Sequence, residues 1–215
     1  MTGSLKGGFV AGTSVHTTNG VKPIQQVQAG DLLLAPTDAS GGATHSRVLQ
    51  ARAIPNVEIY SLVYFPKEQF DLAQQSGRLM SSSPNTEIIA GPDSLFWATA
   101  GWAKGSDLQG DEPKQLQQIN GALSLVDRWA VLHRTVTENV GWVQGSFGND
   151  LGRLVDLRDG KIQTTFERSK RALNREIDWG EEENYLRQTV YYLEAAGARG
   201  FFVGQPGILV SLQTE

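Results

Sequence analysis

The chain contains no cysteine among its 215 residues. This absence excludes disulfide bonds, thiolate zinc sites and cysteine nucleophiles together. Histidine is scarce as well, because only His16, His45 and His133 occur, and they stand far apart without the spacing of metal ligands. The sequence therefore predicts a protein that uses no metal ion or other cofactor.

An excess of positive charge and long apolar runs are also missing. The 19 basic and 23 acidic residues give a formal net charge of −4, which does not favour binding to nucleic acid or to an anionic membrane. No apolar run approaches the roughly 20 residues that a membrane helix needs, and no charged-then-apolar leader opens the chain. We therefore expect a globular, cytoplasmic protein.

Glycine, by contrast, is abundant, with 24 residues that recur beside Val, Ile, Phe and Trp. This pattern predicts many tight turns between short strands. The first such unit is an apolar strand over Phe9–Val15, a hairpin turn at Asn19-Gly20 and a Leu-rich strand over Leu32–Leu34. Further predicted elements are a β-hairpin formed by residues 47–54 and 57–64 and a short helical turn within residues 67–77.

Three blocks of the chain share the order and the hydrophobic pattern of a known family. The first covers residues 8–34, the second joins residues 83–89 to residues 101–111, and the third covers residues 190–212. They resemble the Hint domain, the self-processing module of hedgehog proteins, inteins and many bacterial polymorphic toxins. Its motifs are roughly Cys-Phe-x-Ala-Gly-Thr-x-Val, then Thr-Pro-x-His before an apolar strand and a Gly-Trp segment, and finally a terminal His-Asn.

The resemblance implies a mainly β, Hint-like fold of short curved strands with an inserted β/α segment. Residues 1–7 would then be a flexible lead-in, and residues 8–114 the N-terminal part of the Hint-like domain. Residues 115–187 would be an insertion with strands and one helix, and residues 188–215 the C-terminal strands that complete the same domain. The helix is predicted over Thr165–Glu176, where apolar residues recur at helical spacing.

The resemblance also implies that the reactive groups of the family are replaced. Gly8 stands where the family has its nucleophile, Thr86 where it has its histidine, and Ser211 and Leu212 where it ends in His-Asn. Self-processing needs a thiol or hydroxyl that attacks the preceding carbonyl, a proton donor with a pKa near the working pH and a carboxamide that cyclises. Glycine, threonine and leucine supply none of these groups, so we expect no enzymatic activity.

Hydroxyl groups near these positions leave a second hypothesis open. Thr13 and Ser14 lie near the nucleophile position and residues 81–83 near the histidine position, so a divergent domain could still cleave itself through a hydroxyl. Such hydroxyls more often bond to the local backbone. His16 is expected to be an ordinary strand residue, and Asp31 to brace a Gly-Asp turn.

The insertion carries the candidate contacts for a partner, because tryptophans often anchor protein interfaces and a cluster of acids attracts a basic surface. The candidate residues are Trp142, Trp179, Glu176, Asp178, Glu181, Glu182 and Glu183. Hint domains occur beside toxin modules, so the resemblance implies an immunity protein that binds and neutralises a cognate secreted toxin, such as a nuclease. The protein itself is expected to contact neither nucleic acid nor a membrane.

Overall fold

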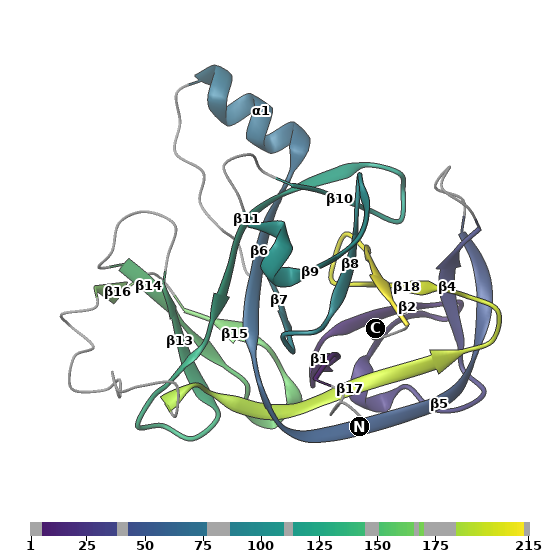
Figure 1. The fold of residues 1–215 in the computed structure, drawn as a ribbon, viewed down its shortest axis with the longest axis horizontal. Helices are drawn as coiled ribbons and strands as arrows, with labels where there is room; N and C mark the ends of the chain where they lie inside the picture. Colours follow the sequence, from purple (N-terminus) through teal and green to yellow (C-terminus); the bar gives the residue numbers. More distant parts are fainter. Residues whose placement is uncertain are drawn as a thin grey trace.

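The computed structural model shows a mainly β fold, which confirms the predicted fold class. It describes residues 6–37, 43–76, 87–109, 114–144, 151–165, 168–169 and 184–212. Within these ranges the strands form one large sheet and one smaller sheet (Figure 1).

The large sheet has 14 strands in the order β10-β11-β6-β7-β1-β17-β5-β4-β2-β18-β19-β8-β9, with β3 paired to β2. Because β10 also pairs with β8, the path of strands closes on itself. The strands are β1 (Phe9–Val10), β2 (Ser14–Thr17), β3 (Gly20–Pro23), β4 (Leu32–Pro36), β5 (Ala43–Glu58), β6 (Tyr60–Pro66), β7 (Glu87–Ala90), β8 (Leu95–Ala98), β9 (Gly101–Lys104), β10 (Gln115–Gln117), β11 (Leu123–Val131), β17 (Arg187–Ala195), β18 (Gly200–Val203) and β19 (Ile208–Ser211).

The first and last parts of the chain meet in this sheet. β1 lies between β7 and β17, with Phe9 opposite both Ala90 and Tyr191. The ring of Phe9 packs edge-on against Phe96 and Phe201, with ring centroids 6.2 Å apart in both pairs. This packing fixes the residue before Phe9, which is Gly8, at the centre of the fold.

The strand predicted over Phe9–Val15 is in fact two strands, β1 and β2, separated by a turn. Gly12 has a φ of +88°, and a Cβ there would lie 2.9 Å from Cα of Lys161. The Gly12 N–H donates instead to Oε1 of Gln25 at 2.8 Å. The chain bends here because only glycine adopts this conformation readily and approaches a neighbouring backbone so closely.

The hairpin predicted from residues 47–54 and 57–64 is also wrong, although both segments are strands. β5 pairs with β17 and β4, whereas β6 pairs with β11 and β7. Between them Ile59 is fully buried, donates its N–H to Leu186 and accepts a hydrogen bond from Leu132. The chain passes from one set of partners to the other without a turn, and Figure 1 shows β5 running beside β17 instead.

The smaller sheet has five strands and packs against the large sheet through a second apolar cluster. Val10 and Ile89 of the large sheet and Ile59, which lies between β5 and β6, meet Val143 and Val155 of the smaller sheet in this cluster. The strands are β12 (His133–Arg134), β13 (Val140–Gln144), β14 (Leu151–Asp156), β15 (Gln163–Thr164) and β16 (Arg168–Ser169). The helix predicted over Thr165–Glu176 is therefore wrong at Arg168–Ser169, where pairing with β14 overrides the helical spacing, and most of its remainder lies outside the described residues.

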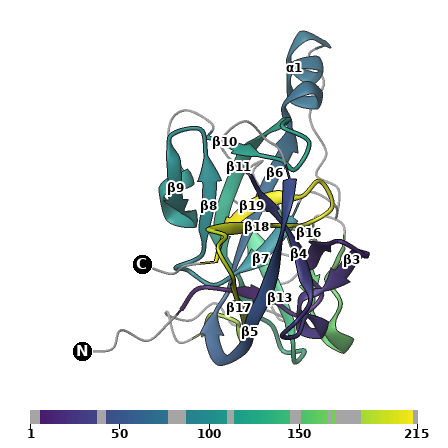
Figure 2. The ribbon, with the colours of Figure 1, turned by 90° about the vertical axis from the view of Figure 1, so that its right-hand side faces the viewer.

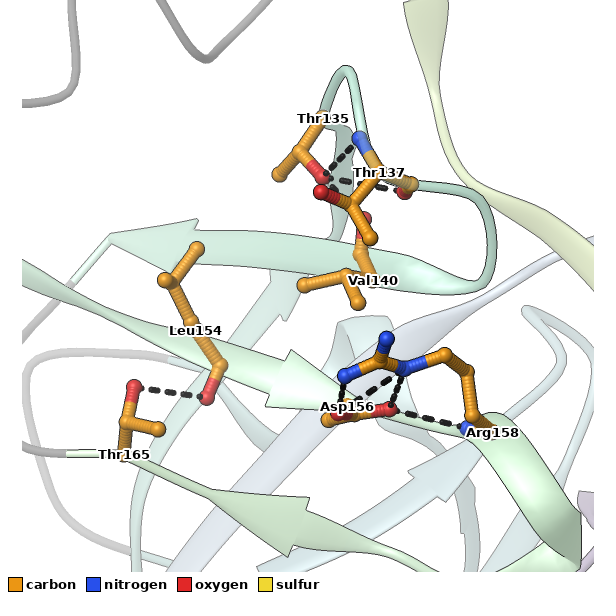
Figure 3. Close-up of polar contacts among 7 residues, drawn as sticks. All are labelled: Thr135, Thr137, Val140, Leu154, Asp156, Arg158 and Thr165. Carbon is orange, nitrogen blue, oxygen red and sulfur yellow. Dashed lines mark hydrogen bonds and ion pairs between the residues drawn. The ribbon is translucent and has the colours of Figure 1, made fainter.

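Short polar contacts hold the turns of the smaller sheet (Figure 3). The Thr135 hydroxyl donates to the carbonyl of Val140 at 2.8 Å and accepts the N–H of Thr137 at 3.2 Å. Asp156 accepts hydrogen bonds from the backbone and side chain of Arg158, and these bonds lower the pKa of the Asp156 carboxyl. A turn at Asp159-Gly160 follows, with both residues at positive φ.

The helical turn predicted after Pro66 is a ten-residue helix, α1 (Lys67–Ser76), with an ion pair of 2.6 Å between Lys67 and Asp71. The helix projects away from the sheets in both ribbon views (Figures 1 and 2). Within the described part of the chain, short 3-10 turns cover Ile24–Gln26, Gly105–Leu108 and Arg158–Gly160. Across the described ranges, no helix has the length and apolar character needed to cross a membrane.

Candidate functional site

Gly8 occupies a position that accepts no side chain. Its φ is +127°, and a Cβ would lie 2.8 Å from the carbonyl oxygen of Tyr191 and 3.2 Å from Cγ2 of Val190. A Cβ that close to backbone atoms overlaps them, and an L-residue is strained at this φ. The strand pairing of β1 with β17 therefore depends on glycine at this position.

The Ser94 hydroxyl clamps the backbone of Gly8 from the other side. It accepts the Gly8 N–H at 3.0 Å and donates to the Gly8 carbonyl at 3.0 Å. The same carbonyl accepts the N–H of Gly91 at 2.9 Å. Both polar groups of Gly8 are thus fixed by residues more than 80 positions away in the sequence.

The structure brings Ser211 to the same place as Gly8 and Ser94. Gly8, Ser94 and Ser211 line one cavity of about 10 Å³, which is about the size of one water molecule. Leu212 is buried, and its N–H donates to the carbonyl of Arg199 at 3.1 Å. Among the described residues that line this cavity there is no imidazole, carboxyl or thiol group.

Ser94 was not predicted from the sequence, although a signal was present. The segment Gly91-Pro92-Asp93-Ser94 has a proline at its second position and leads directly into the apolar strand β8, which Gly101-Trp102 follows closely. The order of these residues resembles the surroundings of the Thr-Pro-x-His motif, with Ser94 at the place of its last residue. The residue that was predicted there, Thr86, lies outside the described residues, as do Ser81–Ser83.

Thr13 departs from the expected local hydrogen bond, because its hydroxyl is buried without a hydrogen-bond partner among the described residues. His16 lies on strand β2, with Nε2 2.8 Å from the carbonyl of Gly204. The Asp31 carboxylate forms an ion pair with the Lys22 ammonium at 2.6 Å and accepts a hydrogen bond from the backbone N–H of Gln28 at 2.9 Å. These contacts confirm its predicted role in a turn. These hydrogen bonds lower the pKa of the Asp31 carboxyl.

A buried ionic group joins the two sheets away from this cavity. The Glu87 carboxylate on β7 accepts a hydrogen bond from the Ser61 hydroxyl and lies 3.4 Å from the guanidinium of Arg153 on β14. Burial raises the pKa of Glu87 by more than the attraction of Arg153 lowers it. The Glu87 side chain is fully buried between the two sheets, and Glu87 also lines a cavity of about 130 Å³ with Thr13 and Ser14.

Trp142 was predicted to anchor a partner at the surface, and this prediction is wrong. Its side chain is 1% exposed, and its ring lies 5.9 Å from that of His133. The absence of a Cβ at Gly152 makes room for it, because such a Cβ would lie 2.3 Å from the indole. The large apolar ring is more stable in the interior of the smaller sheet than in water. The remaining predicted residues, Trp179, Glu176, Asp178, Glu181, Glu182 and Glu183, lie outside the described residues.

The described residues contain no cluster of three or more His, Cys, Asp or Glu side chains that could hold a metal ion. Among the described residues that line the Gly8 cavity, the polar side chains belong to Ser94, Ser211, Tyr191 and Tyr192.

Comparison with known proteins shows the fold. No family model matches the sequence, and no curated protein matches it. Among solved structures, the chain is similar to a bacterial intein-like domain from Clostridium thermocellum, with a TM-score of 0.56 and 17% identity over 97% of this chain and 99% of that one. It is also similar to the gp41-1 intein, with a TM-score of 0.49 and 17% identity over 95% of this chain and 98% of that one. A third similar structure is a DnaB intein from Synechocystis sp. PCC 6803, with a TM-score of 0.49 and 11% identity over 95% and 97% of the two chains. The fold of this chain is therefore that of the Hint and intein domains.

Proposed function

We propose that this protein is a catalytically inactive Hint-fold binding protein. The observation that carries the proposal is the geometry at Gly8, where a Cβ would overlap the Tyr191 carbonyl. A nucleophilic side chain needs both that Cβ and room to reach the preceding carbonyl. The position has thus lost the nucleophile together with the space for one.

The second support is the residue that contacts Gly8. Ser94 follows Pro92 by two residues, ahead of an apolar strand, as the histidine does in the motif Thr-Pro-x-His. We therefore assign the position of the histidine to Ser94 rather than to Thr86. A serine hydroxyl cannot protonate a leaving amine near neutral pH, because its pKa lies far from the working pH. It can fix the backbone by two hydrogen bonds, and these are the bonds it forms.

A direct test follows the peptide bond before Gly8. A small folded tag is fused ahead of Gly8, and the intact mass is recorded over several days with and without hydroxylamine, which captures an ester. We expect the tag to stay attached in both samples. Release of the tag, or a hydroxamate at the junction, would show that the centre is active.

Self-cleavage by a divergent Hint domain is a second candidate function, because the hydroxyls of Ser94 and Ser211 line one cavity with Gly8. The same fusion tests it when Ser94 and Ser211 are replaced singly by alanine. If the fusion is cleaved and one replacement abolishes cleavage, that hydroxyl is required and the inactive assignment fails. An uncleaved fusion excludes this candidate.

For the partner, we propose a secreted bacterial toxin that the protein neutralises in the cytoplasm as an immunity protein. The support is the occurrence of Hint domains beside toxin modules, and it is an argument by association. The acids at residues 176–183 and Trp179 then face a basic toxin surface, whereas the buried Trp142 has no part in the contact.

The toxin role is tested by titrating the purified protein into candidate toxins and measuring their activity. A variant that carries Gln at positions 181–183 is compared with the wild type. We expect stoichiometric inhibition by the wild type and weaker inhibition by the variant, with a larger difference between the two at low salt than at high salt. Unchanged toxin activity at saturating protein would reject the immunity role and leave the inactive Hint fold untouched.

A further inference from the structure

A hollow lined by two tryptophans lies beside strands β8, β9 and β19 of the large sheet. It has a volume of about 360 Å³, which is within the range of roughly 300–1,000 Å³ that small-molecule sites occupy. Its walls come from β8, β9, β10 and β19, from the end of β4 and from the loop between β17 and β18. The residues that matter to the argument are Trp97, Trp102, Leu209, Thr37 and Arg199.

Two indoles form the apolar wall of the hollow. Trp97 and Trp102 face each other across the β8–β9 hairpin, with ring centroids 5.0 Å apart and ring planes at 74°. Both are only partly buried. The ring of Trp102 lies over Gly200, since a Cβ there would be 2.8 Å from the indole and 3.0 Å from Leu209. Packing against Gly200 therefore fixes the position of the Trp102 ring, while both indoles remain partly exposed to solvent.

A single cation stands at the rim. Arg199 is exposed, and its guanidinium has no ion pair or hydrogen bond with any residue in the described ranges. Its backbone, by contrast, is fixed, because its carbonyl accepts the N–H of Leu212 at 3.1 Å and lies 3.4 Å from the Ser211 hydroxyl. The loop before it is held where Ser46 donates to the Ala196 carbonyl at 2.6 Å.

This combination selects for a flat apolar ligand with an anionic end. Stacked or edge-on contact with indoles favours aromatic rings and other flat apolar groups. A free guanidinium forms paired hydrogen bonds with a carboxylate and attracts it from solution. We infer that the hollow between Trp97, Trp102 and Arg199 is a binding site for small hydrophobic carboxylates, with the ring against the indoles and the carboxylate on Arg199. The inference does not rest on a toxin partner or on an inactive Gly8 centre.

The test uses 2-naphthoate as the probe and its uncharged isostere 2-naphthamide as the comparison, both titrated into the full chain by isothermal calorimetry at low salt. We expect saturable binding of naphthoate and at least tenfold weaker binding of the amide. Arg199→Gln should weaken naphthoate binding at least tenfold and leave amide binding unchanged. Arg134→Gln, at an exposed arginine on the smaller sheet, is the matched control and should leave both ligands unchanged.

The apolar wall is tested separately. Trp97→Ala should abolish binding of both probes, and its fold is checked by far-UV circular dichroism. Since loss of an indole can also disturb the hairpin, Thr37→Trp serves as a second variant that fills the hollow from an exposed position. It should block both probes. The inference fails if the wild type shows no saturable naphthoate binding up to millimolar concentration, or if Arg199→Gln and Arg134→Gln weaken it equally. It also fails if Thr37→Trp binds as the wild type does.

Discussion

Replacing Gly8 by alanine tests the geometry on which the inactive assignment depends. The added Cβ would lie 2.8 Å from the Tyr191 carbonyl oxygen, and the residue would have to keep a φ of +127°. The backbone cannot shift easily, because Ser94 holds both the N–H and the carbonyl of Gly8. Gly101 is a natural control, since its φ is +115° and a Cβ there meets nothing within 4 Å.

The two substitutions separate backbone strain from steric overlap. Strain at such a φ costs about 1–3 kcal/mol and applies to both variants. Overlap with well-packed atoms costs about a further 1–3 kcal/mol and applies only at Gly8. We therefore expect Gly8→Ala to lose about 2–6 kcal/mol of unfolding free energy and Gly101→Ala about 1–3 kcal/mol.

The difference in unfolding free energy between the two variants is measured by urea unfolding, monitored by circular dichroism. The comparison requires that both variants keep the wild-type dependence of the unfolding free energy on urea concentration. In a thermal scan, each kcal/mol should lower Tm by about 2–4 °C for a chain of this length. Equal losses in the two variants would refute the reasoning. They would mean that β1 moves away from β17 at little cost and that a side chain at position 8 has room after all.

Three further substitutions test the interior and one turn. Burial raises the pKa of Glu87 above 4.5, so its contribution to stability is present below pH 4.5 and is lost as the pH rises through the raised pKa. In urea unfolding, the wild type should then lose stability relative to Glu87→Gln as the pH rises through that window. A difference in unfolding free energy between the two proteins that does not vary with pH would contradict the raised pKa of Glu87. Trp142→Ala should cost about 3–5 kcal/mol in the same assay because the indole is buried, and a loss below about 1 kcal/mol would place the ring at the surface. Asp31→Ala removes the acceptor of the Gln28 N–H and should lower stability by about 0.5–1.5 kcal/mol, less at high salt, whereas an unchanged midpoint would remove its role in the turn.

The local signals in the sequence predict local structure well. The turn at Asn19-Gly20 forms with Gly20 at a φ of +99°, and the strand at Leu32–Leu34 lies within β4. Turn residues act through their own φ preferences, and alternating apolar residues act through the two faces of a strand. Both properties depend only on a few consecutive residues, so they can be predicted without knowledge of the rest of the chain.

Strand partners and buried positions depend on residues far away and could not be read this way. The segments 47–54 and 57–64 alternate correctly, but the register that joins β5 to β17 is set across more than 100 residues. Tryptophan is a residue type that often anchors interfaces, and only the packing of Trp142 against His133 and Gly152 within the smaller sheet shows that it is interior. The two-residue strand at Arg168–Ser169 likewise exists because β14 lies beside it.

The proposed inactive assignment implies that restoring a side chain at Gly8 does not restore activity. A nucleophile at this position would need space that the present pairing of β1 and β17 fills with the Tyr191 carbonyl. Once glycine stands there, the strands can approach more closely, and Ser94 can fix the Gly8 backbone from the opposite side. Each of these contacts raises the free-energy cost of restoring a side chain. A single Gly8→Cys change should therefore destabilise the protein without restoring cleavage in the tag fusion, even when Ser94→His is added. Cleavage by that double variant would show that the space is still available and that the loss of activity lies in the side chains alone.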